Sequence, residues 1–136
     1  MFSIREVAYF GFEVTDLPRA RVFYENMLGL RPALTFGTTE KGWVEYSIGA
    51  LTFVISNNNT PEDAPPPSLG PCLALEVADF DAAVAHLRQN GVNFFGEPAE
   101  SPLCWIADVF DPDGKRICIH QMKAARGGPP KSNVGR

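Results

Sequence analysis

The sequence is poor in the features that mark membrane and nucleic-acid-binding proteins. It has no run of about 18 consecutive apolar residues, which excludes a membrane-spanning helix. Its 16 acidic residues outnumber its 12 Lys and Arg, for a net charge of −4 and a pI of about 5.1. A nucleic-acid or anionic-membrane binder would carry a basic patch. We therefore expect neither a nucleic acid nor a membrane as partner.

Cysteine is also scarce, and its spacing is informative. The three cysteines, Cys72, Cys104 and Cys118, are odd in number and never closely paired. A disulfide framework or a structural zinc motif would need even numbers or close pairs. The first ten residues, MFSIREVAYF, lack the basic region and apolar stretch of a secretory signal. We expect reduced thiols and a cytoplasmic location.

What the chain does have is enough hydrophobic residues for one ordinary domain. It has 136 residues, of which 45% are hydrophobic. Residues 57–70 are rich in Asn and Pro and are predicted to be a linker. Residues 124–136 contain Gly-Gly-Pro-Pro and no periodicity, which predicts a flexible C-terminal tail. We expect a single domain over residues 1–123.

That domain contains an internal repeat. An apolar residue followed by Glu-Val-x-Asp occurs at 12–16 and again at 75–79. Each Asp suits the N-cap of a helix, and the helices are expected to end near Gly29 and Gly91. Three strand-like runs follow each helix, at residues 31–37, 42–48 and 50–56 and at 92–96, 104–110 and 115–122. The fold class is therefore α+β, with two βαβββ modules in tandem at residues 4–56 and 71–122.

Alternation along the strands predicts which side chains face away from the helices. The more apolar face of each sheet should pack on its helix, so the second faces would line a cavity between two curled half-sheets. The offset that relates Asp16 to Asp79 pairs three further positions of the two modules. The pairs are Tyr9 with Cys72, Glu45 with Asp108 and Ile55 with Cys118. All three cysteines are predicted to face the same concavity.

One stretch, FDPDGKRICIHQ at residues 110–121, joins a turn to a chemically rich strand. Asp-Pro-Asp-Gly suits a tight turn, because Pro presets φ and Gly tolerates positive φ. Arg116, Cys118 and His120 then alternate with two isoleucines. Such alternation predicts a strand with one apolar and one polar face.

These patterns together resemble a known family. The segment DLPRARVFYENMLG at residues 16–29, the Glu-Val-Ala-Asp at 76–79, residues 87–92 and the Asp-Pro-Asp-Gly turn at 111–114 occur in the expected order. The chain resembles the glyoxalase/bleomycin-resistance/extradiol-dioxygenase proteins, also called vicinal oxygen chelate proteins, over residues 4 to 122. The resemblance implies paired βαβββ modules that form a curved mixed sheet around a cavity. In many members a divalent metal in that cavity chelates two adjacent oxygens of a substrate.

The family's metal-ligand positions carry unusual residues in this chain. Carried over one by one, they fall on Tyr9, Cys72 and Cys118 and on or near Ile55. Mg²⁺, Mn²⁺ and Fe²⁺ prefer carboxylate and imidazole ligands, so no standard metal site is predicted. The family's bleomycin-resistance type binds a drug without catalysis and as a dimer. We therefore predict a metal-independent small-molecule-binding protein without cofactor, and a homodimer.

Two other functions remain open. One is a metal-dependent lyase or dioxygenase of the same family with one divalent metal ion on atypical ligands. The other is a structural module whose cavity is filled by side chains. The residues predicted to contact a small-molecule ligand share an expected position on the cavity side: Tyr9, Trp43, Glu45, Phe53, Cys72, Asp108, Cys118 and His120.

Several of these side chains allow more than one interpretation. Cys72 and Cys118 can pack as small hydrophobes, hold a soft metal with His120 or Tyr9 nearby, or form a redox pair. His120 can act as a general base or ligand contact, or lie as a polar residue at the rim. Glu45 and Asp108 line the cavity unless the strand parity slips by one residue, which would place them on the surface.

Overall fold

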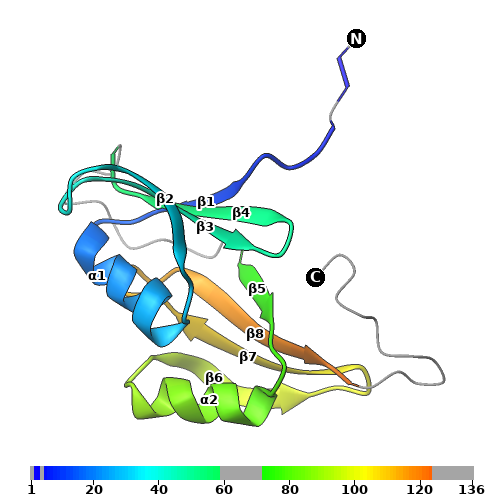
Figure 1. Cartoon of the computed structure of the whole chain (residues 1–136). Helices are drawn as coiled ribbons and strands as arrows, with labels where there is room; N and C mark the ends of the chain where they lie inside the picture. The colour runs from blue at the N-terminus through cyan, green and yellow to red at the C-terminus, as the bar shows by residue number, and fades with distance from the viewer. Residues whose placement is uncertain (1, 4, 59–71, 124–136) are drawn as a thin grey trace. The chain divides into compact units, whose positions relative to one another are not determined.

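The computed structural model describes residues 2–3, 5–58 and 72–123, and its chain divides into two compact units (Figure 1). The first unit spans Met1–Ala64 and the second Pro65–Arg136. The predicted tail at 124–136 and nearly all of the predicted linker lie outside the described residues. Each unit has one four-stranded mixed sheet and its own helix, so the fold is α+β, as expected.

The first unit has the element order strand, helix, strand, strand, strand. Its sheet order is β1-β4-β3-β2, with β1 parallel to β4 and the other pairs antiparallel. Its elements are β1 (Phe10–Glu13), α1 (Leu17–Arg21), the π-helical η1 (Val22–Met27), β2 (Pro32–Gly37), β3 (Gly42–Ile48) and β4 (Leu51–Ser56).

The helix of the first unit begins and ends where the sequence predicts. The Asp16 carboxylate accepts the backbone N–H of Arg19 at 3.0 Å, which satisfies one of the unpaired donors at a helix start. Gly29 follows the helix with a φ of 75°, a conformation that glycine adopts without strain. The sequence did not indicate that the second half of this helix is π-helical.

Aromatic rings form the core between that helix and its sheet. Tyr24 of η1 lies with its ring centroid 5.2 Å from that of Phe53 and 6.4 Å from that of Tyr46. All three side chains are fully buried. The Tyr46 hydroxyl donates to Glu25 of η1 at 2.8 Å, and Arg21 donates to the same carboxylate oxygen at 2.6 Å. Burial and the Glu25 carboxylate raise the pKa of Tyr46 well above its usual range.

The second unit repeats the same order of elements. Its sheet order is β5-β8-β7-β6, again with one parallel pair, β5 with β8. Its elements are β5 (Leu73–Glu76), α2 (Phe80–Gln89), β6 (Phe94–Glu100), β7 (Cys104–Phe110) and β8 (Arg116–Met122). Strand β6 runs four residues beyond the predicted segment 92–96 because a register shift between Phe95 and Ala99 lets its pairing with β7 continue.

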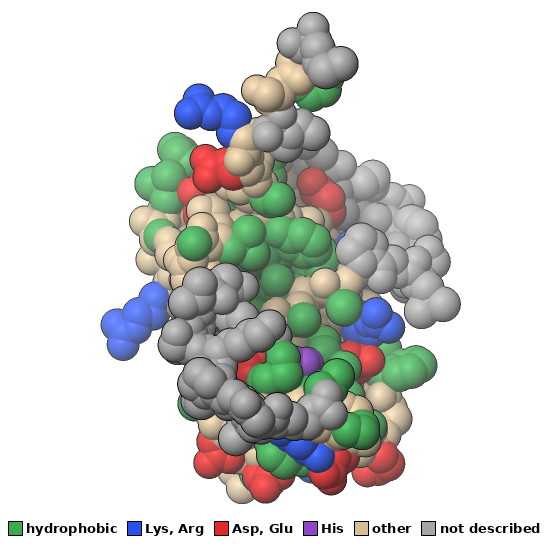
Figure 2. Space-filling model, turned by 90° about the vertical axis from the view of Figure 1, so that its right-hand side faces the viewer, with side chains coloured by type: hydrophobic (Ala, Val, Ile, Leu, Met, Phe, Trp, Pro, Cys, Tyr) green, Lys and Arg blue, Asp and Glu red, His purple; other side chains and the backbone are tan. Residues whose placement is uncertain are grey.

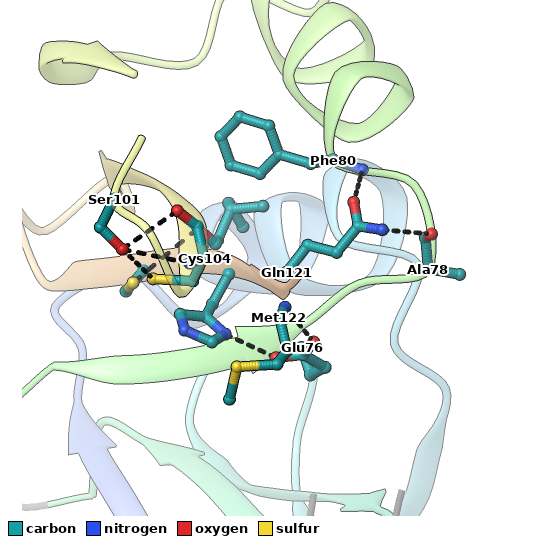
Figure 3. A network of polar contacts seen from close by, with 10 residues as sticks. Glu76, Ala78, Phe80, Ser101, Cys104, Gln121 and Met122 are labelled. Atoms are coloured by element: carbon teal, nitrogen blue, oxygen red, sulfur yellow. Dashed lines mark hydrogen bonds and ion pairs between the residues drawn. The ribbon is translucent and has the colours of Figure 1, made fainter. Parts of the chain in front are cut away.

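Helix α2 is tied to its sheet at its N-terminus. Asp79 accepts the backbone N–H of Ala82 at 3.0 Å as its N-cap. The Gln121 side chain of β8 accepts the Phe80 backbone N–H at 2.7 Å and donates to the Ala78 carbonyl at 3.1 Å (Figure 3). Gly91 follows the helix with a φ of 72°, as predicted. Both helix starts in the described residues therefore depend on an Asp.

The described helices are short and amphipathic. None of them is long and apolar enough to cross a membrane. The first residue of the predicted linker, Asn57, is buried against the first sheet. Its side chain accepts from Gly42 N at 3.0 Å and donates to the Glu40 carbonyl at 2.9 Å, so it belongs to the folded first unit.

Candidate functional site

In each unit, one face of the sheet carries that unit's helix and the other does not; we call the second the helix-free face. Strand pairing assigns residues to these faces, because directly opposed residues point to the same side. On the helix-free face of the first unit lie Tyr9, Gly11, Leu34, Phe36, Trp43, Glu45 and Val54. On that of the second unit lie Cys72, Ala74, Glu76, Phe95, Cys104, Ile106, Asp108, Phe110, Arg116, Cys118, His120 and Met122.

An aromatic cluster occupies the helix-free face of the first unit. The rings of Tyr9 and Trp43 meet edge to face, with centroids 5.3 Å apart. The Trp43 indole N–H donates to the Glu45 carboxylate at 2.8 Å. Tyr9 reaches over Gly11, since a Cβ at Gly11 would lie 3.7 Å from the Tyr9 ring. The structure thus brings together three predicted site residues, Tyr9, Trp43 and Glu45.

Two apolar residues that the sequence analysis did not select extend this cluster. Leu34 lies opposite Glu45 and Phe36 lies opposite Trp43 in the β2–β3 pair. Their side chains are 46% and 58% exposed, and Tyr9 is 52% exposed. Figure 2 shows hydrophobic side chains at the surface of the first unit. The alternation of apolar and polar residues in Leu34-Thr35-Phe36 indicates that Leu34 and Phe36 share a face of the strand. Only the pairing of β2 with β3 shows which face that is.

One predicted site residue, Phe53, lies on the helix-bearing face of its sheet, whereas the sequence analysis placed it on the cavity side. It pairs with Phe10 in β1 and Tyr46 in β3, and its ring packs on Tyr24 of the helix. It is therefore core. The prediction was wrong because it paired Ile55 with Cys118, which put Ile55 and Phe53 together on the cavity side of the strand. The same pairing shows that Cys118, opposite Ala74, corresponds to Val54, opposite Gly11, and not to Ile55. The offset between the modules increases by one residue at their last strands.

Three of the predicted ligand-contact residues in the second unit, Cys72, Asp108 and Cys118, lie near Arg116. Cys118 lies opposite Asp108, and both neighbour Arg116 on the helix-free face. Burial first, then the Asp108 carboxylate and Cys72, raise the pKa of the Cys118 thiol from 9.0 to about 12. A hydrogen bond to the Cys72 side chain, followed by the charges of Cys72 and Asp108, raises the pKa of Arg116. The Arg116 Nε atom is buried without a hydrogen-bond partner among the described residues.

Cysteines on this face are thiols and not a disulfide. Cys72, Cys104 and Cys118 are all free, so the redox-pair hypothesis gains no support. Cys118 is buried, with its sulfur 3.9 Å from the Ile119 carbonyl. Cys104 lies beside the Ser101 hydroxyl, with 3.4 Å between sulfur and oxygen (Figure 3). Trp105 has the opposite parity and lies on the helix-bearing side of the sheet, opposite Gln121.

The eighth predicted residue, His120, forms a pair with Glu76. His120 Nδ1 lies 2.5 Å from Glu76 Oε1, and the second carboxylate oxygen accepts the Met122 backbone N–H at 2.7 Å (Figure 3). The two side chains are 19% and 22% exposed. Glu76 is not among the predicted site residues, because a carboxylate at a strand end before an N-cap is commonly solvated. The parallel pairing that places it opposite His120 carries no short-range sequence signal.

The donor set at the family's metal positions does not fit a hard divalent metal. Those positions hold Tyr9, Val54, Cys72 and Cys118, which supply neither imidazole nor carboxylate. Burial raises the pKa of the Cys118 thiol, which opposes formation of the thiolate that a metal ligand must be. Within the described residues, no three His, Cys, Asp or Glu side chains are grouped to hold an ion.

Comparison with known proteins identifies the fold family. The model of the Glyoxalase/Bleomycin resistance protein/Dioxygenase superfamily matches residues 6–119. The crystal structure of TnmS3, an antibiotic binding protein from Streptomyces sp. CB03234, is 27% identical, with a TM-score of 0.70. The alignment covers 90% of this chain and 99% of that chain. No curated protein matches the sequence.

Two further structures share the fold at lower identity. The trypanothione-dependent glyoxalase I of Leishmania major is 22% identical over 87% of each chain, with a TM-score of 0.71. A protein of unknown function from Agrobacterium tumefaciens str. C58 is also 22% identical, over 88% of this chain and 96% of that chain, with a TM-score of 0.73. At these identities, the similarity shows the architecture alone.

Proposed function

Because the chain belongs to the glyoxalase/bleomycin resistance protein/dioxygenase superfamily, we propose that it binds a small aromatic molecule without a metal ion. The contact surface is the helix-free face of its first unit. The observation that carries this proposal is the Tyr9–Trp43 pair, extended by the exposed side chains of Leu34 and Phe36. Small-molecule sites combine apolar and aromatic walls with few polar groups, and Glu45 beside Trp43 supplies one such group.

The residues at the metal positions support binding over metal-assisted chemistry. Tyr9 occupies the first of them and offers an aromatic ring where metal-holding members place a ligand atom. Aromatic rings attract other rings in offset or edge-to-face contact, worth about 0.5–1.5 kcal/mol beyond burial. The similarity to TnmS3, described as an antibiotic binding protein, supports the same class of function.

Equilibrium dialysis against 7-methoxycoumarin, a planar aromatic probe, tests the proposal. We expect saturable binding to the protein in the presence of a chelator. Tyr9→Ser removes one ring of the pair and should weaken binding by roughly 3- to 10-fold. Val22→Ser, at an exposed apolar residue on the helix, is the matched control and should leave binding unchanged. Equal affinities for wild type and Tyr9→Ser would refute the assigned face.

We also propose that the protein is a homodimer in the cytoplasm. The family's drug-binding type supports the dimer, and the three free thiols are consistent with a reducing compartment. Light scattering coupled to size exclusion should give twice the chain mass of 14.9 kDa. A mass of one chain across the accessible concentration range would contradict it.

A further inference from the structure

The aromatic cluster on the helix-free face of the first unit lies beside negative charge. Glu45 is on β3 with Trp43, and its carboxylate accepts the indole N–H at 2.8 Å. Glu13, at the end of β1, belongs to the same face, because it lies opposite Ser56, which in turn lies opposite Trp43. Two carboxylates therefore lie on the side of the sheet that carries the Tyr9 and Trp43 rings.

The strands contribute no basic side chain to this face. Strand pairing assigns to it aromatic, aliphatic, glycine, serine and threonine residues besides the two glutamates, and no Lys, Arg or His of the residues that the structure describes. The charge that the strands place on the face is thus of one sign. A surface lined by one sign of charge favours ligands of the opposite sign.

The two rings supply a second attraction for a cation. Tyr9 and Trp43 meet edge to face with centroids 5.3 Å apart, and Tyr9 is 52% exposed. The face of an aromatic ring carries partial negative charge and attracts an ammonium group within about 6 Å of its centroid. The hydrogen bond from Trp43 holds the Glu45 carboxylate next to these rings. One cationic group can therefore contact a ring and the carboxylate together, whereas a neutral group gains neither attraction.

The Glu45 carboxylate keeps the capacity to bind such a group. Its Oε2 atom accepts the Trp43 indole N–H. A carboxylate offers about four lone-pair sites on its two oxygens, so acceptor positions remain for an ammonium N–H. The same contact satisfies the only polar atom of the Trp43 side chain, and a ligand has no need to do so.

Resting on the proposed small-molecule function, we propose that this face selects aromatic ligands that carry a protonated amine. The ligand ring packs on the Tyr9–Trp43 pair, and its ammonium group donates a charge-assisted hydrogen bond to Glu45 while lying against a ring. Glu45 is then the residue that determines the preference for a cation over a neutral molecule of the same shape.

A matched ligand pair tests this preference in the unmodified protein. 4-(Aminomethyl)-7-methoxycoumarin and 4-(hydroxymethyl)-7-methoxycoumarin have nearly the same shape and both donate hydrogen bonds, but only the first is charged below the pKa of its amine. In equilibrium dialysis we expect the amine to bind about 10-fold more tightly, through one cation–π contact and one exposed ion pair. Added salt should lower this affinity ratio, because it screens exposed charges.

The outcomes separate this proposal from the proposed function. Equal affinities, or no binding of either compound while 7-methoxycoumarin binds, would overturn the preference for an amine and leave the proposed function standing. Failure of all three compounds to bind would refute the proposed function and this proposal with it.

Variants then assign the preference to Glu45. Glu45→Gln keeps an oxygen that can accept the Trp43 N–H but removes the charge, so the affinity ratio should fall to roughly 3. Glu97→Gln makes the same change at a side chain that is 90% exposed and contacts Arg88 of α2 in the second unit. It is the matched control and should keep the wild-type ratio. A ratio that Glu45→Gln leaves unchanged would refute the assignment.

Discussion

Alkylation of the three cysteines should separate Cys118 from the other two. Cys118 is 4% exposed, whereas Cys72 and Cys104 are half-buried. The pKa of Cys118 lies about three units above its ordinary value, at about 12. Its thiolate fraction near neutral pH is therefore about 1,000-fold lower than that of an ordinary thiol. A more basic thiolate is more nucleophilic, by roughly 20- to 30-fold for such a difference, so the net slowing is about 30- to 50-fold.

Iodoacetamide labelling with peptide mapping measures this directly. Samples are quenched over time at about pH 8, and the modified fraction of each cysteine peptide is determined. Cys118 should react at least 30-fold more slowly than Cys104, since burial restricts access in addition to the pKa effect. Labelling in denaturant is the control, because the three thiols should then react alike. Comparable rates for Cys104 and Cys118 in the folded protein would refute the reasoning.

The same raised pKa makes stability depend on alkaline pH. When the pKa of a group is higher in the folded than in the unfolded state, its contribution to stability is complete at any pH below the unfolded-state pKa. That contribution is lost as the pH rises through the folded-state pKa. For Cys118 the window runs from about 9 to about 12. One and a half pH units into the window, wild type should lose about 2 kcal/mol relative to Cys118→Ala. Urea unfolding at each pH measures the difference, and parallel curves for the two proteins would contradict it.

Three further changes test the fold that positions the site. Tyr46→Phe removes the 2.8 Å hydrogen bond to Glu25 and should lower the free energy of unfolding, measured by urea titration, by about 1–2 kcal/mol. A double-mutant cycle with Glu25→Gln should show that the effects of the two substitutions are not additive. Asp79→Ala should cost about 1 kcal/mol by loss of the α2 N-cap, and an unchanged urea midpoint would contradict the cap. Asn57→Ala removes one buried and one partly buried hydrogen bond and should cost about 2–3 kcal/mol, whereas Asn58→Ala, at the exposed neighbour, should cost little.

Local sequence signals accounted for most of the fold. Asp16 and Asp79 cap the helices, and Gly29 and Gly91 follow them with positive φ, because caps and turns depend on residues that are close in sequence. Alternation likewise placed Trp43 and Glu45 on the helix-free face. These features need no knowledge of which strands are neighbours.

Features that depend on distant pairing were missed. Phe53 was assigned to the wrong face because a constant offset between the modules paired Ile55 with Cys118, which put Ile55 and Phe53 on the cavity side; the register of β4 with β1 shows that Val54 takes that place. Glu76 contacts His120, 44 positions away in the sequence, because β5 and β8 form a parallel pair. Strand pairing of this kind is set by packing and leaves no local signature.

Metal-free binding at the Tyr9–Trp43 face is the central claim, and one titration tests it most directly. Protein dialysed against chelator, with its metal content determined, is titrated calorimetrically with 7-methoxycoumarin before and after addition of Zn²⁺, Ni²⁺ or Mn²⁺. We predict saturable binding at near-zero metal content, with an affinity that none of the three ions changes. Binding that appears only with about one metal ion per chain would contradict the claim.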